Sequence, residues 1–182
     1  MESTWNFKEK KEVFSTSFLS IEQWIIVTPQ GKEIQPFVDK KHDAVIIFPV
    51  TEEGKIVTLN QYFVSHQRSF MTLVAGIVEE GEDRLKTAER ELLEEAGYEA
   101  EEMVYLGAAH RGKWTMGTMH FYIAKNAART QPQQLEAEEE IEVRELSVEH
   151  VKQLLRSGEL QDMGVFGCAY RALDYLGLLS DI

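Results

Sequence analysis

Three glutamates close together in the middle of the chain could do chemistry as a group. Glu91, Glu94 and Glu95 follow Arg90, and on a helix they fall within an arc of roughly 100°. Like charges at this spacing destabilise a helix, and these lie near its carboxyl end, where the helix dipole favours cations. A divalent cation such as Mg²⁺ would offset both costs, because it binds carboxylate oxygens together with water and phosphate oxygens. The alternative is an acidic face that is simply exposed to solvent.

The helix that carries these glutamates is expected over residues 84–96. Apolar side chains recur at helical spacing and should anchor it to a core: Leu85, Ala88, Leu92 and Ala96. Gly97 follows as a natural stop, because glycine adopts the left-handed conformation that ends many helices.

Strands are expected on both sides of this helix. Residues 1–40 are rich in β-branched and aromatic side chains around the turn "TPQGK", which predicts an antiparallel ribbon. Further strands are indicated by "HDAVIIFPV", "GKIVTLNQYF", "FMTLVAGIV" and "IEVRELS", and "EMVYLGAAHRGKWTMGTMHFYIAKNA" indicates two more strands around a loop that contains glycine. Two more helices are expected, one at about 148–156 between the cap Ser147 and Gly158, and one at about 163–177. Together these elements predict a mixed sheet covered by helices.

The composition bounds the class of protein. The chain has 182 residues, 43% of them apolar, which is enough for one domain with a small appendage. Its net charge of −12 argues against a nucleic-acid partner, because a phosphate backbone requires a basic surface. A small phosphorylated ligand is still compatible with this charge, because a bound divalent cation reverses the local sign.

Cysteine content and hydropathy indicate the compartment. Cys168 is the single cysteine, so an intrachain disulfide and a cysteine zinc cluster are excluded, and a buried thiol is expected. No apolar run approaches the roughly 20 residues of a membrane span, and the segment "MESTWNFKEKKEVF" does not have the pattern of a signal peptide. The protein is therefore expected to be soluble and cytoplasmic, with no membrane partner.

The spacing around the three glutamates resembles a family signature. It reads Gly76, five residues, Glu82, seven residues, Arg90-Glu91-Leu92, one residue, Glu94-Glu95, one residue, Gly97-Tyr98. This pattern resembles the signature of the Nudix hydrolases at every defined position. The resemblance implies an α/β fold, the Nudix α/β/α sandwich with a mixed β-sheet, over residues 41–182. Residues 1–40 look like the N-terminal β extension of the ADP-ribose and nucleotide-sugar pyrophosphatases, which often builds a homodimer.

The resemblance also implies a cation site, for Mg²⁺ or alternatively Mn²⁺. Carried over by position, the implied ligands are oxygen donors: the carboxylates of Glu91, Glu94 and Glu95 and the backbone carbonyl of Ala75. Arg90 would orient these carboxylates, and Glu82 would support the loop that precedes the helix. Glu94 and Arg90 are therefore also implied as catalytic residues.

The catalytic base of the pyrophosphatase subgroup usually lies in a later acidic loop. Here "EAEEEIEV", residues 136–143, resembles that loop. Aligning on "IEV" puts the base at Glu139, and the neighbouring Glu138 and Glu140 stay open as alternatives. A solvated acidic loop without a catalytic role is the plain reading of the same residues.

Candidate substrate contacts come from loops that depart from the subgroup. Phe63 stands where an arginine is common, so Arg68 is a candidate phosphate contact. The stretch "AAHRGKWTMGTMHFY" lacks the subgroup's usual proline and adds Arg111 and Lys113, which are further phosphate candidates, and Trp114, which can stack on a base or simply pack. Aromatic residues of the extension are candidates for stacking on a nucleobase: Trp5, Phe7, Phe14, Trp24 and Phe37.

The function implied is a Mg²⁺-dependent pyrophosphohydrolase that cleaves a nucleoside diphosphate sugar to a nucleoside monophosphate and a sugar phosphate. The missing proline weakens ADP-ribose as sole substrate and leaves room for GDP-mannose. Two alternatives stay open. One is a Nudix hydrolase of dinucleoside polyphosphates, NADH or capped RNA, and the other is a Nudix domain that senses a nucleotide without cleaving it.

Overall fold

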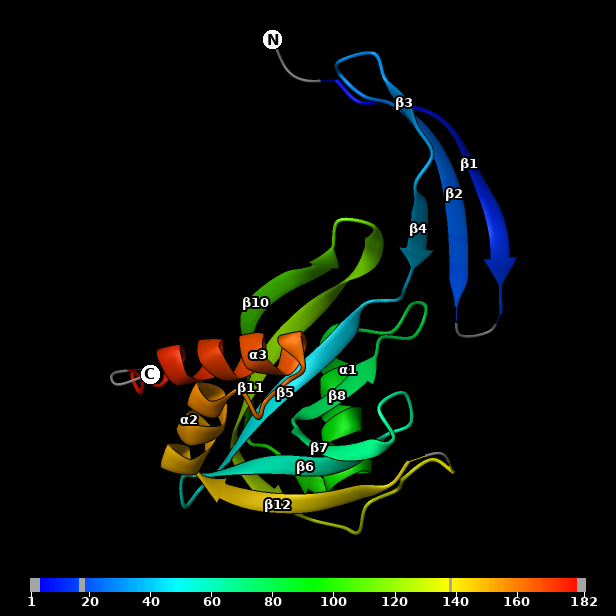
Figure 1. Ribbon diagram of the computed structural model, residues 1–182. Helices are drawn as coiled ribbons and strands as arrows, with labels where there is room; N and C mark the ends of the chain where they lie inside the picture. Colours follow the sequence, from blue (N-terminus) through cyan, green and yellow to red (C-terminus); the bar gives the residue numbers. More distant parts are fainter. Residues whose placement is uncertain (1–3, 17–18, 138, 180–182) are drawn as a thin grey trace. The chain divides into compact units, whose positions relative to one another are not determined.

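The computed structural model describes residues 4–16, 19–137 and 139–179. The chain divides into two compact units (Figure 1). The extension unit consists of Met1–His42 with His110–Thr118, and the core unit consists of Asp43–Ala109 with Met119–Ile182.

The extension unit is built from β-strands: β1 (Asn6–Ser15), β2 (Ser20–Val27), β3 (Glu33–Ile34) and β4 (Phe37–Lys40). β1, β3 and β4 each pair antiparallel with β2, as the sequence predicts. The predicted turn is closed by the Thr28 N–H, which donates to the Lys32 carbonyl at 2.9 Å, with Gly31 at a φ of +79°. All ten residues of β1 are exposed, so this strand forms an edge with one unpaired side.

The core unit holds a mixed sheet. Its strands are β5 (Ala44–Thr51), β6 (Lys55–Phe63), β7 (Arg68–Thr72), β8 (Val74–Ile77), β9 (Tyr98–Glu99), β12 (Ile141–Ser147) and the longer parts of β10 (Glu102–Gly112) and β11 (Thr115–Arg129). The central order is β11–β5–β6–β12, and β8 also pairs with β5. β11 runs parallel to β5, whereas β8 and β12 run antiparallel to their neighbours, so the predicted mixed sheet is confirmed.

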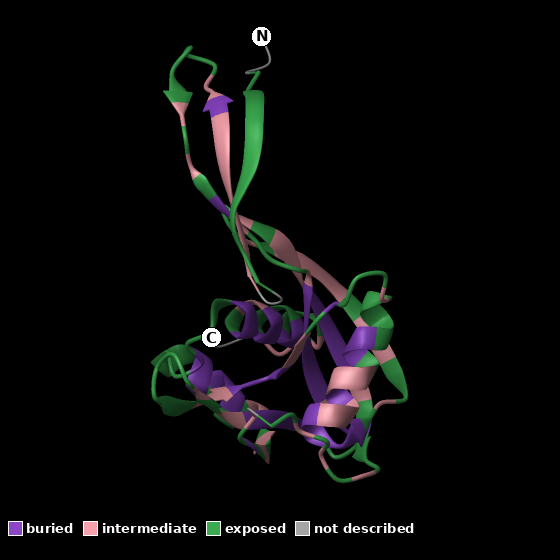
Figure 2. Ribbon diagram, turned by 90° about the vertical axis from the view of Figure 1, so that its right-hand side faces the viewer, coloured by how far each residue is buried: buried purple, intermediate pink, exposed green. Residues whose placement is uncertain are grey.

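Helices cover both faces of this sheet. They are α1 (Arg84–Glu91), continued by the π-helical turn η1 (Leu92–Ala96), α2 (Val148–Ser157) and α3 (Met163–Tyr175). Along β5, Ile46 and Phe48 pack with the apolar side chains of α2 and α3, whereas Val45 and Ile47 pack with those of α1 and η1. Buried strands therefore lie between two helical layers (Figure 2), which confirms the predicted α/β/α sandwich.

Local sequence signals set most helix ends as expected. The Ser147 hydroxyl accepts from the His150 N–H and caps α2, and Gly158 ends that helix in the left-handed conformation. On α1, Asp83 is the cap, with one carboxylate oxygen accepting from the Leu85 and Lys86 N–H groups. The expectation that Leu85 anchors this helix is wrong. It lies in the first turn and is 39% exposed, and the fully buried Thr87 and Ala88 of the next turn face the core instead.

The predicted single helix over 84–96 changes its winding at Leu92. The last turn is π-helical, and the N–H of Gly97 reaches both the Leu92 and Leu93 carbonyls. A π turn is rare and frequently marks a functional site. Nothing in the periodicity indicates it, because Ala88, Leu92 and Ala96 keep their predicted positions in the core.

Two further expectations concern burial and membranes. Cys168 is a fully buried thiol, as predicted, and burial raises its pKa well above the usual range. None of the helices in the described part of the chain is long and apolar enough to cross a bilayer.

The two helix-ending glycines allow a matched stability test. Gly97 and Gly158 have nearly the same backbone angles, but a Cβ at position 97 would overlap the Gln131 carbonyl oxygen, whereas one at position 158 meets nothing within 4 Å. We expect Gly158→Ala to lower the free energy of unfolding by about 1 kcal/mol, the cost of left-handed backbone alone. Gly97→Ala should cost about 3 kcal/mol or more, because a backbone oxygen cannot easily move away. Urea unfolding of both variants measures the difference, and equal losses would contradict the packing described here.

Candidate active site

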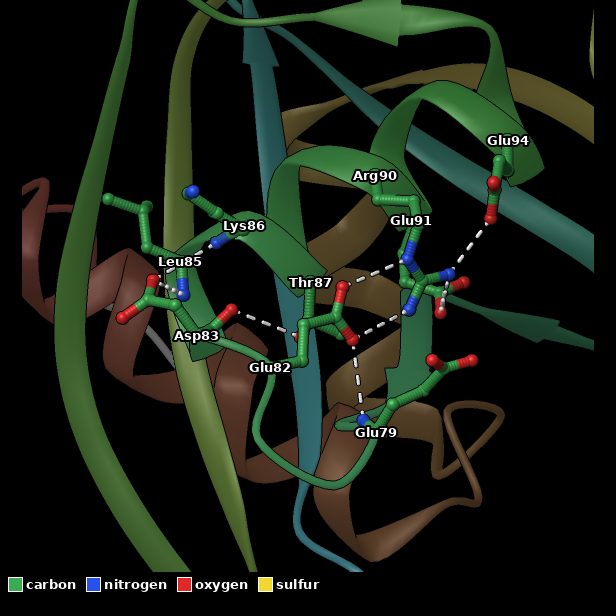
Figure 3. Close-up of polar contacts among 9 residues, drawn as sticks. All are labelled: Glu79, Glu82, Asp83, Leu85, Lys86, Thr87, Arg90, Glu91 and Glu94. Atoms are coloured by element: carbon green, nitrogen blue, oxygen red, sulfur yellow. Dashed lines mark hydrogen bonds and ion pairs between the residues drawn. The ribbon is translucent and has the colours of Figure 1, made fainter.

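One guanidinium holds three glutamates of the α1–η1 helix and its preceding loop (Figure 3). Arg90 Nε and Nη2 donate to the two oxygens of Glu82, each at 3.2 Å. Its Nη1 donates to Glu91 Oε1 at 2.8 Å and to Glu94 Oε2 at 2.9 Å. These ion pairs raise the pKa of Arg90, with Glu82 as the largest cause, and lower the pKa of Glu82. Arg90 therefore sets the relative positions of three carboxylates.

The loop before α1 is shaped by its own hydrogen bonds and by a glycine. The Glu79 N–H donates to Glu82 Oε2 at 3.3 Å, in the same carboxylate that binds Arg90 (Figure 3). Gly81 adopts a φ of +82°, which other residues rarely adopt, so the loop can turn directly into the helix. Glu82 thus ties the loop to the middle of the helix through Arg90.

Gly76 leaves room for the carboxylate of Glu91. A Cβ at position 76 would overlap the Glu91 carboxyl carbon, so a side chain larger than glycine would push this carboxylate out. The Glu91 side chain is only 13% exposed as a result. The glycine is required here for a close approach rather than for its backbone angles.

Glu95 is more deeply buried than the other acids. It is 5% exposed, and its Oε2 accepts the backbone N–H of Ala75 on β8 at 2.9 Å. The sequence predicts that the carbonyl of Ala75 is a cation ligand. The contact with Glu95 is made by the N–H of Ala75, so the role of the carbonyl stays a prediction. The interpretation as an exposed acidic face is therefore wrong for Glu95, which points toward the sheet.

Burial shifts the protonation of both inner carboxylates. Loss of solvation is the main cause that raises the pKa of Glu91 to about 7, against the opposing effect of Arg90. The same cause raises the pKa of Glu95 to about 8, against the Ala75 N–H that stabilises its charge. The charge of Glu139 adds to both shifts. The two carboxylates therefore have pKa values close to neutral pH, and a cation bound beside them would favour their ionised forms.

The predicted base loop lies within electrostatic reach of these carboxylates. Glu139 is partly buried, and its Oε2 accepts the Glu136 N–H at 2.9 Å in a tight turn. Glu140 is exposed, and its carbonyl accepts the Tyr62 N–H. Glu138, the other alternative, lies outside the described residues. The fold therefore brings an acidic residue from far along the chain to the α1–η1 carboxylates.

Comparison with known proteins identifies the family. A family model described as "NUDIX domain" matches residues 40–163. The chain is 30% identical over 171 residues to an ADP-ribose pyrophosphatase of Bacillus subtilis (strain 168), covering 93% of this chain and 90% of the relative. The chain belongs to the Nudix family. It is thus a hydrolase of pyrophosphate linkages, as expected from the motif.

Two other comparisons extend this result. The Nudix chain is 29% identical over 162 residues to a protein named methanol dehydrogenase activator from Bacillus methanolicus, with 86% of this chain and 88% of the relative covered. A solved structure of an ADP compounds hydrolase superposes with a TM-score of 0.84 at 16% identity, and the match covers 100% of this chain and 98% of the other. At this low identity the structural match supports the fold alone.

Nudix hydrolases generally use divalent cations, and the donor set here fits one. Glu82, Glu91 and Glu94 bind the guanidinium of Arg90, Glu95 follows on the same helix, and all four carboxylates offer hard oxygen donors of the kind that Mg²⁺ binds. Among the described residues, no three acidic or histidine side chains converge as a ready metal site, and Arg90 Nη1 engages Glu91 and Glu94.

The two predicted phosphate-binding arginines lie in different units of this Nudix protein. Arg68, in the core unit, donates to Gln161 Oε1 at 3.1 Å and stacks over the Phe70 ring at 4.3 Å. Arg111 belongs to the extension unit, and its Nε is buried without a hydrogen-bond partner among the described residues. Contact of either arginine with a phosphate stays a prediction.

Sequence reasoning missed a buried polar group in the core unit. His120 is 4% exposed, and its ring nitrogens lie 3.0 Å from the Tyr105 hydroxyl and 3.2 Å from Asp43 Oδ2. Arg84, at the start of α1, lies over the same ring. The histidines show no metal-ligand spacing along the chain, so only the fold brings these groups together.

The metal-free protein should lose stability as pH rises. Glu91 and Glu95 bind protons more tightly when folded than an ordinary glutamate, whose pKa is 4.5, so the free energy of unfolding falls between about pH 5 and pH 8. We expect Tm in EDTA to fall over this range, and Glu95→Gln to reduce the fall by about 3 °C or more, since one pKa unit corresponds to about 1.4 kcal/mol. Circular dichroism melting curves measure this.

Glu89→Gln is the matched control for this experiment, because Glu89 is exposed on the same helix and loses the same charge. Added Mg²⁺ should raise Tm more at about pH 8 than at about pH 6, because cations and protons compete for the same carboxylates. An identical pH dependence of Tm in wild type and Glu95→Gln would show that the carboxylate is not buried as described.

Proposed function

We propose that this chain is a Mg²⁺-dependent pyrophosphohydrolase of nucleoside diphosphate sugars, with ADP-ribose as the preferred substrate. The reaction yields a nucleoside monophosphate and a sugar phosphate. The observation that carries the proposal is the pair of largely buried carboxylates, Glu91 and Glu95, which Arg90 and the Ala75 N–H hold in place. A charged pair in this environment is costly to maintain unless a cation binds it.

In this proposal the carboxylates of Glu91, Glu94 and Glu95 and the Ala75 carbonyl hold the cation. A divalent cation bound there would supply positive charge to neutralise the diphosphate and would activate water for attack. Arg90 holds Glu91 and Glu94 through one nitrogen, and so keeps two ligands oriented before the substrate arrives. The Ala75 N–H does the same for Glu95.

Glu139 is the proposed general base. Support comes from its charge, which acts on both Glu91 and Glu95, and from the turn that holds its carboxylate. A base must lie within reach of the attacking water. The charge of Glu139 acts on the proposed metal ligands, whereas Glu140 is exposed, so Glu139 meets this requirement better. Glu139 would accept the proton of the water that attacks phosphorus.

The substrate class rests on similarity and on the extension unit. The ADP-ribose pyrophosphatase match covers 93% of the chain, so the similarity reaches into the extension. That unit contains a groove of about 280 Å³ rich in aromatic and apolar residues: Trp5, Phe7, Trp24, Ile26, Val38, Trp114 and Met116. Lys113 lies over the Trp114 ring at 4.7 Å. Flat rings beside a cation have the chemistry that stacks on a nucleobase.

GDP-mannose is the second candidate, because residues 108–122 contain no proline and include Arg111 and Lys113. The homodimer is likewise a proposal. The fully exposed edge strand β1 supports it, since Phe7, Val13 and Phe14 are each more than 40% exposed there.

A substrate panel tests the function. We expect ADP-ribose to give the highest kcat/KM among ADP-ribose, GDP-mannose, NADH and a dinucleoside polyphosphate, with AMP released in Mg²⁺ and no turnover in EDTA. Mn²⁺ is assayed in parallel. A preference for GDP-mannose would revise the substrate, whereas nucleotide binding without cleavage would favour a sensing domain and reject the enzyme.

Substitutions in the acidic loop test the base. Glu139→Gln should lower kcat by about 10²- to 10⁴-fold, because it removes the proton acceptor while keeping the shape of the side chain. Glu140→Gln is the matched control and should retain kcat within about threefold. Glu138→Gln tests the other alternative, and a large loss in that variant with none in Glu139→Gln would move the base to Glu138.

A further inference from the structure

The loop that leads to Glu139 is attached to the end of the α1–η1 helix. A helix leaves its last carbonyl groups without partners inside the helix. Here the Gln134 N–H donates to the Glu94 carbonyl at 2.8 Å, and the Thr130 N–H donates to the Gly97 carbonyl at 2.9 Å. The chain that follows β11 therefore satisfies the end of η1 before it continues to the acidic loop.

Gln133 makes the most specific of these contacts. Its Nε2 donates to the Glu95 carbonyl at 2.6 Å and to the Ile141 carbonyl at 3.3 Å. Ile141 opens β12, so the same amide nitrogen bridges the last turn of the helix and the first residue after the acidic loop. Only a side chain with two N–H groups on one nitrogen can donate to two carbonyls in this way.

The bridge confines Glu139 from both sides. Glu139 lies between Gln133 and Ile141 in the chain. The side-chain nitrogen of Gln133 donates to the Ile141 carbonyl and so links these two residues. Glu95 is also held at both ends, because its carbonyl accepts from Gln133 and its carboxylate accepts from Ala75. A movement of the loop would therefore be transmitted to Glu95, a cation ligand in the proposed function.

We infer that Gln133 is a positioning residue that fixes the base Glu139 relative to the carboxylates of Glu91 and Glu95. It acts through backbone carbonyls and does not touch the reacting atoms. This inference rests on the proposed function, since the role of Glu139 comes from there. The contact itself is a property of the fold and can be tested separately.

The first test separates turnover from substrate binding. Gln133→Ala should lower kcat about 10- to 100-fold with KM changed less than about threefold, because a misplaced base slows the reaction without removing substrate contacts. Gln133→Glu should lose at least as much, since it places a carboxylate against two carbonyls. Gln134→Ala is the matched control, because its backbone N–H makes the contact with Glu94 and is retained. Equal kcat values for Gln133→Ala and wild type would overturn the inference while leaving the function intact.

A double variant distinguishes positioning from a general loss of structure. If Gln133 acts through Glu139, adding Gln133→Ala to Glu139→Gln should lower kcat by less than about twofold further. Independent multiplication of the two losses would overturn the inference.

Amide exchange tests the bridge without activity. In Gln133→Ala, exchange at the Gln134 and Glu139 amides should rise about tenfold or more, while exchange at Val143 within β12 stays unchanged. Unchanged exchange at Gln134 and Glu139 would overturn the bridge. If wild type cleaves no diphosphate, the proposed function fails, and the exchange result alone decides whether Gln133 holds the loop.

Discussion

The site depends on the cost of holding negative charge out of water. Glu91 and Glu95 are both largely buried, and burial is the main cause of their raised pKa values. Each receives limited compensation, Glu91 from a guanidinium that it shares with two other acids and Glu95 from one backbone N–H. A protein that places like charges in such an environment gives up stability that a cation can restore. Much of the local structure can be understood as the means of keeping these two carboxylates in place.

The sandwich supplies the rigid surroundings that this charge requires. β8 lies against β5 and presents the Ala75 N–H, while Gly76 next to it leaves space for Glu91. On the helix side, Ala88, Leu92 and Ala96 are fully packed, so the carboxylates cannot move outward by tilting the helix. Packed apolar side chains thus hold a polar arrangement that would not form on an isolated helix, because three neighbouring glutamates oppose helix formation.

Pattern arguments were most successful where one residue type has one physical role. The caps Ser147 and Gly158, the stop at Gly97 and the strand formed by "AVIIFPV" all follow from local chemistry, and all are present. Leu85 shows the limit of such arguments, because helical spacing identifies a face but not which turn of that face meets the sheet. The π turn at Leu92 was not predicted either, since it is decided by how the helix end fits the chain around it. The bridge made by Gln133 could not be predicted from the sequence, because Gln133 stands among similar polar residues and no pattern distinguishes it from them.

Residue types and their spacing were enough to identify the family, the mixed sheet between helical layers and the cluster of glutamates on one helix. These follow from residue type and spacing over short distances, where the geometry of a helix or strand is nearly fixed. Tertiary structure alone decided the depth of Glu95, the sharing of Arg90 among three acids and the approach of Glu139 to the helix. Burial, pKa and contacts between distant segments depend on which surfaces meet when the chain folds, and no local pattern records this.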